Sequence, residues 1–168
     1  MFSKRIKISS DTVKDNDLGM ISFANYGDVG EYRCRLRLAI SSKKVDVFFS
    51  TDAKEDLPTD QQKDFLKSIV DNYDTLIDKS ILLISNSADH SYLKGKSIAK
   101  FELHPVSLIV PQIDKGKFNW DMTFEVRSVK DVFVIVYFDK FAPLSSTIEQ
   151  DERKPLTKFL LRLLNGNV

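Results

Sequence analysis

Two neighbouring stretches decide the fold: residues 118–127 read FNWDMTFEVR and residues 132–138 read VFVIVYF. In the first stretch apolar and polar residues alternate at every position, which is typical of a β-strand with one buried face. The second stretch is apolar on both faces and rich in β-branched and aromatic residues, as in a strand covered on both sides. A short polar connection joins them, so we predict an antiparallel hairpin whose second strand is central in a sheet.

A second pair of strands is predicted upstream of this hairpin. Residues 32–40 alternate strictly, with an apolar face that includes Cys34, and residues 45–49 (VDVFF) return after a polar turn. The polar face of the first strand consists of Arg33, Arg35 and Arg37. Asp46 is placed to face this arginine row across the ladder, where opposite charges attract.

A long helix is predicted between the two pairs of strands. Thr59 and Gln62 have the spacing of a capping box, in which each side chain bonds to a backbone amide at the start of a helix. From Leu66 to Ile84 apolar residues recur in steps of three and four, which predicts one amphipathic helix over about residues 60–85. The opposite face of that helix carries Asp64, Asp71, Asp74 and Asp78.

The remaining segments complete the predicted fold. Residues 101–110 have strand composition, but Pro105 lacks an amide donor, so we expect an edge strand. Residues 143–153 read as a polar connector, and Pro155 opens a short amphipathic helix over about residues 155–165. We therefore predict a single α+β domain over residues 1–168, with a mostly antiparallel sheet and both helices packed on one face.

Composition narrows the classes of protein that fit. The chain has 168 residues, of which 42% are hydrophobic, and a formal net charge of +1. The balanced charge provides no overall field for nucleic acid or a membrane. The single cysteine excludes an internal disulfide, and no apolar run is long enough to span a membrane or act as a signal segment, so we expect a cytoplasmic protein.

The order of motifs resembles a known family. The TDQQ sequence at residues 59–62 leads into a helix, LHPVSLIV follows at residues 103–110, and Trp120-Asp121 opens the alternating strand. This order is similar, over roughly residues 32–139, to bacterial domains of unknown function found among immunity proteins of polymorphic toxin systems. The resemblance implies an intracellular α+β protein that binds a partner and is not an enzyme. Relatives often carry Glu-His-Gly after the Trp-Asp pair, and this chain has Met122-Thr123-Phe124 instead, so no role of that histidine is transferred.

The sequence contains no metalloprotease helix, phosphate-binding loop, nucleophile elbow or paired-cysteine metal motif. We accordingly assign no catalytic residue, metal or cofactor. An enzyme remains an alternative, with His104 acting as a base beside Asp121 or Glu125, although a histidine making an ordinary hydrogen bond is the simpler interpretation. We expect Cys34 to be a small core residue, because it shares a strand face with apolar neighbours.

We favour a protein-binding domain, which includes an immunity-type inhibitor of a bacterial toxin. Its binding surface would be the aspartate face of the helix or an exposed sheet edge, and the aspartates would attract a basic protein. The alternative is a nucleic-acid binder, because side chains two residues apart on a strand lie about 7 Å from each other and suit successive phosphates. The neutral balance and the lack of aromatics beside the arginine row argue against it. Both charged rows also fit a merely solvated surface.

Overall fold

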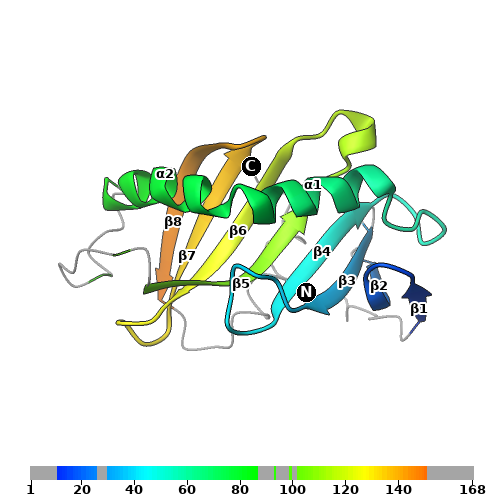
Figure 1. The fold of residues 1–168 in the computed structure, drawn as a ribbon, viewed down its shortest axis with the longest axis horizontal. Coiled ribbons are helices and arrows are strands. Elements are labelled where there is room, and N and C mark those ends of the chain that lie inside the picture. The colour runs from blue at the N-terminus through cyan, green and yellow to red at the C-terminus, as the bar shows by residue number, and fades with distance from the viewer. Residues whose placement is uncertain (1–10, 26–29, 87–92, 94–98, 100–101, 151–168) are drawn as a thin grey trace, which may run out of the picture.

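The structure is a computed structural model that describes residues 11–25, 30–86, 93, 99 and 102–150. These residues form one eight-stranded sheet with two helices across one face (Figure 1). The strands are β1 (Thr12–Asp15), β2 (Gly19–Asn25), β3 (Gly30–Leu36), β4 (Val45–Thr51), β5 (Leu103–Val110), β6 (Asn119–Val126), β7 (Val132–Asp139) and β8 (Ala142–Gln150). The helices are α1 (Asp60–Asp71) and α2 (Tyr73–Ser85), and a 3-10 helix, η3 (Ile113–Lys115), precedes β6.

The strands lie in the sheet in the same order as in the chain. Neighbouring strands are antiparallel except β4 and β5, which are parallel, with Val47 opposite Leu108. Parallel neighbours need a connection that returns the chain to the other end of the sheet, and α1 and α2 provide it. The predicted fold class is therefore wrong: the described residues form one mixed sheet, dominated by strands, that carries two short helices.

The predicted single helix over residues 60–85 is interrupted at Asn72. The backbone N–H of Asn72 and its side-chain Nδ2 both donate to the carbonyl of Ser68, at 3.1 and 2.8 Å. Asparagine competes with the backbone for hydrogen bonds in this way, which makes it a poor residue for a helix interior. Two short helices, nearly end to end in Figure 1, therefore replace the long one. The capping box at Thr59 and Gln62 is confirmed.

The predicted hairpin is confirmed as the antiparallel pair of β6 and β7. Trp120 anchors it against the helices, because its ring stacks on Phe138 at 4.2 Å and meets Phe65 of α1 edge-on at 6.0 Å. The indole Nε1 donates to the carbonyl of Lys140 at 2.6 Å, so the polar edge of the ring is satisfied inside the core. The hairpin thus contributes two strands to the sheet and, through Trp120, contacts α1.

Two strand positions differ from the prediction. β5 is an interior strand, because the register shifts between Pro105 and Ser107 and this bulge accommodates the missing amide donor. β7 lies beside the edge, because the predicted polar connector forms β8 up to Gln150. Only Ile148 of β8 is fully buried, which explains why its sequence looked like a loop.

The predicted helix over residues 155–165 lies outside the described residues. Within the described part of the chain, neither helix has the length and apolar character that crossing a membrane requires.

The two faces of α2 generate a stability prediction. Ile84 is fully buried, whereas Leu82 on the same helix is 69% exposed. Ile84→Ala leaves a cavity and should lower the free energy of unfolding by about 2–5 kcal/mol. Leu82→Ala, which removes the same number of atoms, should change it by less than about 0.5 kcal/mol. Urea unfolding measures both, and equal losses would contradict this orientation of α2.

Candidate functional site

The four predicted helix aspartates lie on the solvent side of α1 and α2. Asp64, Asp71, Asp74 and Asp78 are all exposed. We call them the acidic row. The buried stripe of the same helices, which includes Ile69 and Ile77, faces the sheet. The sequence therefore predicted correctly which side of the helices carries these carboxylates.

One lysine that could offset the acidic row is engaged elsewhere. The Nζ of Lys63 lies 2.9 Å from a carboxylate oxygen of Asp15 and 3.0 Å from one of Asp17, both at the β1–β2 turn. Asp15 is itself fixed by the backbone amides of Asp17 and Leu18. Lys63 therefore neutralises carboxylates of the β1–β2 turn.

An exposed leucine continues the acidic row on α2. Leu82 follows Asp74 and Asp78 in steps of four residues, so the three side chains lie on one helix face. With 69% of its surface exposed, Leu82 is the most exposed large hydrophobic side chain of the described residues. Sequence reasoning missed it. The signal was the apolar run of residues 81–84, because a helix cannot bury four consecutive side chains in one stripe.

The arginine row is tied to Asp46, as predicted from the strand register. Arg35 donates to both carboxylate oxygens of Asp46, at 2.9 and 3.1 Å, and Arg33 Nη2 lies 3.1 Å from one of them. Burial opposes ionisation of Asp46, but the hydrogen bonds and charges of the two arginines outweigh it and lower its pKa. Arg37 lies beyond the end of β3 and is exposed.

The structure assembles only part of the alternative catalytic group. His104 and Glu125 are paired across β5 and β6, and Glu125 binds Lys43 at 3.0 Å. Asp121 is four residues from Glu125 along β6, a separation of about 13 Å for an extended chain. Burial, followed by the charges of Arg127 and Lys43, lowers the pKa of His104 below its ordinary value. Among the described residues no group of three His, Cys, Asp or Glu side chains could hold a metal ion.

Cys34 is a buried core residue, as predicted. Burial, followed by the charges of Asp15 and Asp46, raises the pKa of its thiol to about 12. The thiol therefore stays protonated near neutral pH and is unsuited to act as a nucleophile.

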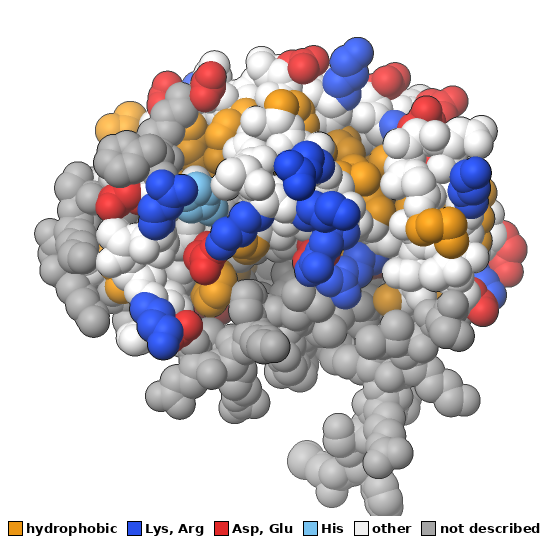
Figure 2. Space-filling model, turned by 60° about the horizontal axis from the view of Figure 1, so that its bottom comes forward, with side chains coloured by type: hydrophobic (Ala, Val, Ile, Leu, Met, Phe, Trp, Pro, Cys, Tyr) orange, Lys and Arg blue, Asp and Glu red, His pale blue; other side chains and the backbone are white. Residues whose placement is uncertain are grey.

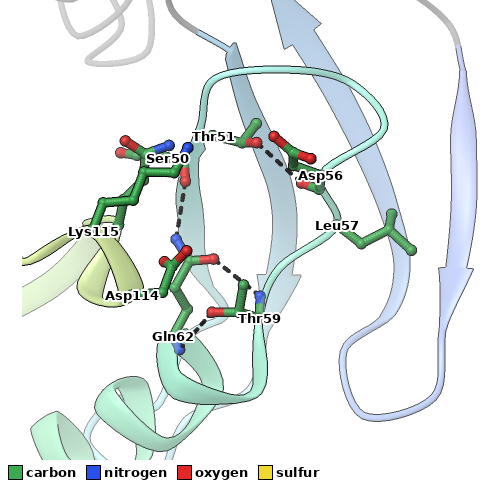
Figure 3. Close-up of a pocket in the computed structure, with 9 residues that line it drawn as sticks. Ser50, Thr51, Asp56, Leu57, Thr59, Gln62, Asp114 and Lys115 are labelled. Atoms are coloured by element: carbon green, nitrogen blue, oxygen red, sulfur yellow. Dashed lines mark hydrogen bonds between the residues drawn. The ribbon is translucent and has the colours of Figure 1, made fainter.

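A hollow of about 380 Å³ opens where the carboxyl ends of β4 and β5 meet the start of α1 (Figure 3). Ligands commonly bind at such positions in proteins with parallel strands. In this hollow the polar side chains bond to other groups of the protein. Thr51 Oγ1 lies 3.0 Å from the carbonyls of Ala53 and Asp56, and Lys115 pairs with Asp52. We therefore assign this hollow a structural role.

Gln62 lies at the base of the hollow and is almost fully buried. Its Nε2 donates to the carbonyls of Ser50 and Pro111, at 2.9 and 3.1 Å, and its Oε1 accepts from the backbone amide of Thr59. One side chain thus joins the ends of both parallel strands to the first turn of α1.

Glu31 is a buried carboxyl that sequence reasoning did not identify. It has no solvent exposure, and within the described residues neither of its carboxylate oxygens has a hydrogen-bond partner. Burial, followed by the charge of Asp121, raises the pKa of Glu31 to about 8. The group is thus mostly protonated at neutral pH. The sequence carried no signal for this, because Glu31 looked like a polar residue at the start of a strand.

Gln62→Ala should lower the free energy of unfolding by about 2–4 kcal/mol. The substitution removes three hydrogen bonds and leaves two backbone carbonyls and one backbone amide without these partners. The neighbouring Gln61→Ala provides the matched control, because Gln61 is exposed and should contribute less than about 0.5 kcal/mol. Chemical unfolding monitored by circular dichroism compares the two variants. A loss no larger for Gln62→Ala than for Gln61→Ala would contradict the bridging role.

Glu31 makes stability depend on pH. Below its ordinary pKa of 4.5 the carboxyl is protonated in both states, and between 4.5 and about 8 only the unfolded chain releases the proton. Stability should therefore fall as pH rises through this window, by up to about 5 kcal/mol. Glu31→Gln removes this contribution, so its stability relative to wild type should rise between pH 4 and pH 9 in urea unfolding.

The exposed Glu55→Gln is the control for this titration and should keep the wild-type pH profile. A constant difference between Glu31→Gln and wild type at every pH would show that Glu31 does not titrate as described.

Comparison with protein-family models, with curated proteins and with solved structures found no match to the chain.

Proposed function

We propose that this chain is a partner-binding domain whose acidic row and Leu82 contact a basic surface of another protein. The observation that supports it most is the alignment of Leu82 with Asp74 and Asp78 on one exposed helix face. An interface uses both kinds of residue, because apolar anchors provide affinity and surrounding charges provide orientation and speed of association.

The charge of this surface defines the chemistry of the partner. Asp60, in the first turn of α1, adds a fifth exposed carboxylate to the same two helices. Lys67 and Lys79 are the exposed lysines of these helices, so acids outnumber bases on their outer side. A partner with a basic patch and an apolar socket for Leu82 would complement this surface.

The specific form of the proposal is the immunity-type inhibitor predicted from the sequence. A nucleic-acid-cleaving toxin has a basic substrate-binding surface, and an acidic domain that covers it would block the substrate. Such an inhibitor works inside the cell, so the proposal includes a cytoplasmic location. It requires no catalytic group on this chain.

The test measures binding kinetics against purified products of the genes adjacent to the one that encodes this chain. The triple variant Asp71→Asn, Asp74→Asn, Asp78→Asn should slow association at least about tenfold at low salt and flatten the salt dependence. Leu82→Ala should mainly speed dissociation, because it removes an apolar anchor without changing the charge.

The control is the triple variant Glu55→Gln, Asp131→Asn, Asp139→Asn, which removes three exposed carboxylates that belong to neither α1 nor α2. It should bind like wild type. If both triple variants bind an identified partner equally well, the acidic row is not the contact surface and the proposal fails.

A further inference from the structure

Basic side chains gather at the end of the sheet where β4 and β5 begin. Lys43 and Lys44 directly precede β4, and Arg127 directly follows β6. The amide of Arg127 bonds to the carbonyl of Glu102 at 2.8 Å, which holds it beside the start of β5. Figure 2 shows Lys and Arg side chains in a band across this side of the molecule.

We call this group the basic band. It consists of Arg33, Arg35, Arg37, Lys43, Lys44 and Arg127. Two carboxylates are paired with it: Asp46, which is buried behind two arginines, and Glu125, which binds Lys43. Cations therefore exceed these paired anions in the band, although the whole chain is nearly neutral.

Asp46 holds the two strand arginines in fixed positions. Arg35 uses its Nε and Nη2 for this contact and keeps 58% of its side chain exposed, so further N–H donors remain for a ligand. Arg33 also lies over the ring of Phe48, with its guanidinium carbon 5.5 Å from the ring centre. Guanidinium groups that are already oriented lose less entropy when they bind an anion.

The pKa of His104 responds to the positive charges of the band. Its pKa is lowered first by burial and then by Arg127 and Lys43, while Glu125 opposes the effect. The Nε2 atom is buried and, within the described residues, has no hydrogen-bond partner. An anion bound between Lys43 and Arg127 would reverse their influence on the imidazole.

We propose that the basic band binds the phosphate backbone of nucleic acid. Arg33 and Arg35 both contact the carboxylate of Asp46, so their guanidinium groups form one compact cationic site. Lys43, Lys44 and Arg127 supply further positive charges for neighbouring phosphates. Phe48, the ring beneath Arg33, is 2% exposed and does not offer a stacking surface. Contacts to phosphates carry no information about the bases, so binding by the band is independent of base sequence. It uses a different surface from the acidic row and does not depend on the partner proposed above.

The test uses the full chain and a fluorescent oligothymidylate of about 20 nucleotides, with anisotropy measured from about 50 to 200 mM salt. Wild type should show salt-dependent binding, and a mixed-sequence oligonucleotide should bind equally well. The double variant Lys44→Gln, Arg127→Gln should weaken binding at least about tenfold at low salt and reduce the logarithmic salt slope by about 1.4. Both residues are exposed, so thermal unfolding should match wild type.

The matched control is Lys67→Gln with Lys79→Gln, which removes two exposed positive charges from the helix side. It should leave affinity and salt slope unchanged. A second readout is the pKa of His104 from ring-proton NMR, which should rise when the oligonucleotide binds.

Several results would overturn the proposal. Wild type could show no salt-dependent binding, or binding could survive the double variant, which would place it elsewhere on the chain. An unmoved His104 titration would also remove the band as the contact. Competition by polyglutamate at equal charge concentration would show that the band recognises any polyanion, including an acidic protein, rather than a nucleic acid.

Discussion

The parallel pairing of β4 and β5 is the constraint on which the rest of the structure depends. The other strand pairs are antiparallel neighbours in sequence and can form locally, but this pair requires the chain to cross the sheet. Gln62 stabilises the start of the connection between these two strands. It bonds to carbonyls at the ends of both parallel strands and caps α1. In the described sheet the pairing of β4 with β5 joins the four strands β1–β4 to the four strands β5–β8.

The placement of α1 and α2 on one face of the sheet also separates acidic side chains from basic ones. Because α1 and α2 cover one face of the sheet, their outward side carries the acidic row, and the arginines of β3 point from the opposite face. A net charge of +1 therefore describes neither surface. It averages an acidic side over a basic one, and the fields that steer association are set by the separate surfaces. For this reason composition alone is a poor guide to what such a chain binds.

Local sequence rules predicted the features that depend on neighbours in the chain. The hairpin, the capping box and the pairing of Asp46 with the arginines follow from alternation, spacing and register. The parallel pair, the interior place of β5 and the edge strand β8 depend on contacts between distant residues, which periodicity does not encode. Asn72 itself indicated a helix break, but the apolar stripe that continues across this residue favoured a single helix. Among candidate site residues, the exposure of the aspartates was predictable, and the apolar run of residues 81–84 was a signal for Leu82, whereas Glu31 required the fold.

Both faces of the sheet carry buried polar groups. On the helix side Gln62 and Ser80 are buried and hydrogen-bonded. The buried polar atoms that lack partners among the described residues belong to Glu31, His104, Thr123 and Thr147. Strand alternation places these four on the opposite face. Stability alone selects against such groups, and natural proteins retain them where recognition or chemistry offsets the cost. Within the described residues the face opposite the helices therefore holds both kinds of buried polar group, those of the four side chains without a partner and Asp46, which Arg33 and Arg35 satisfy.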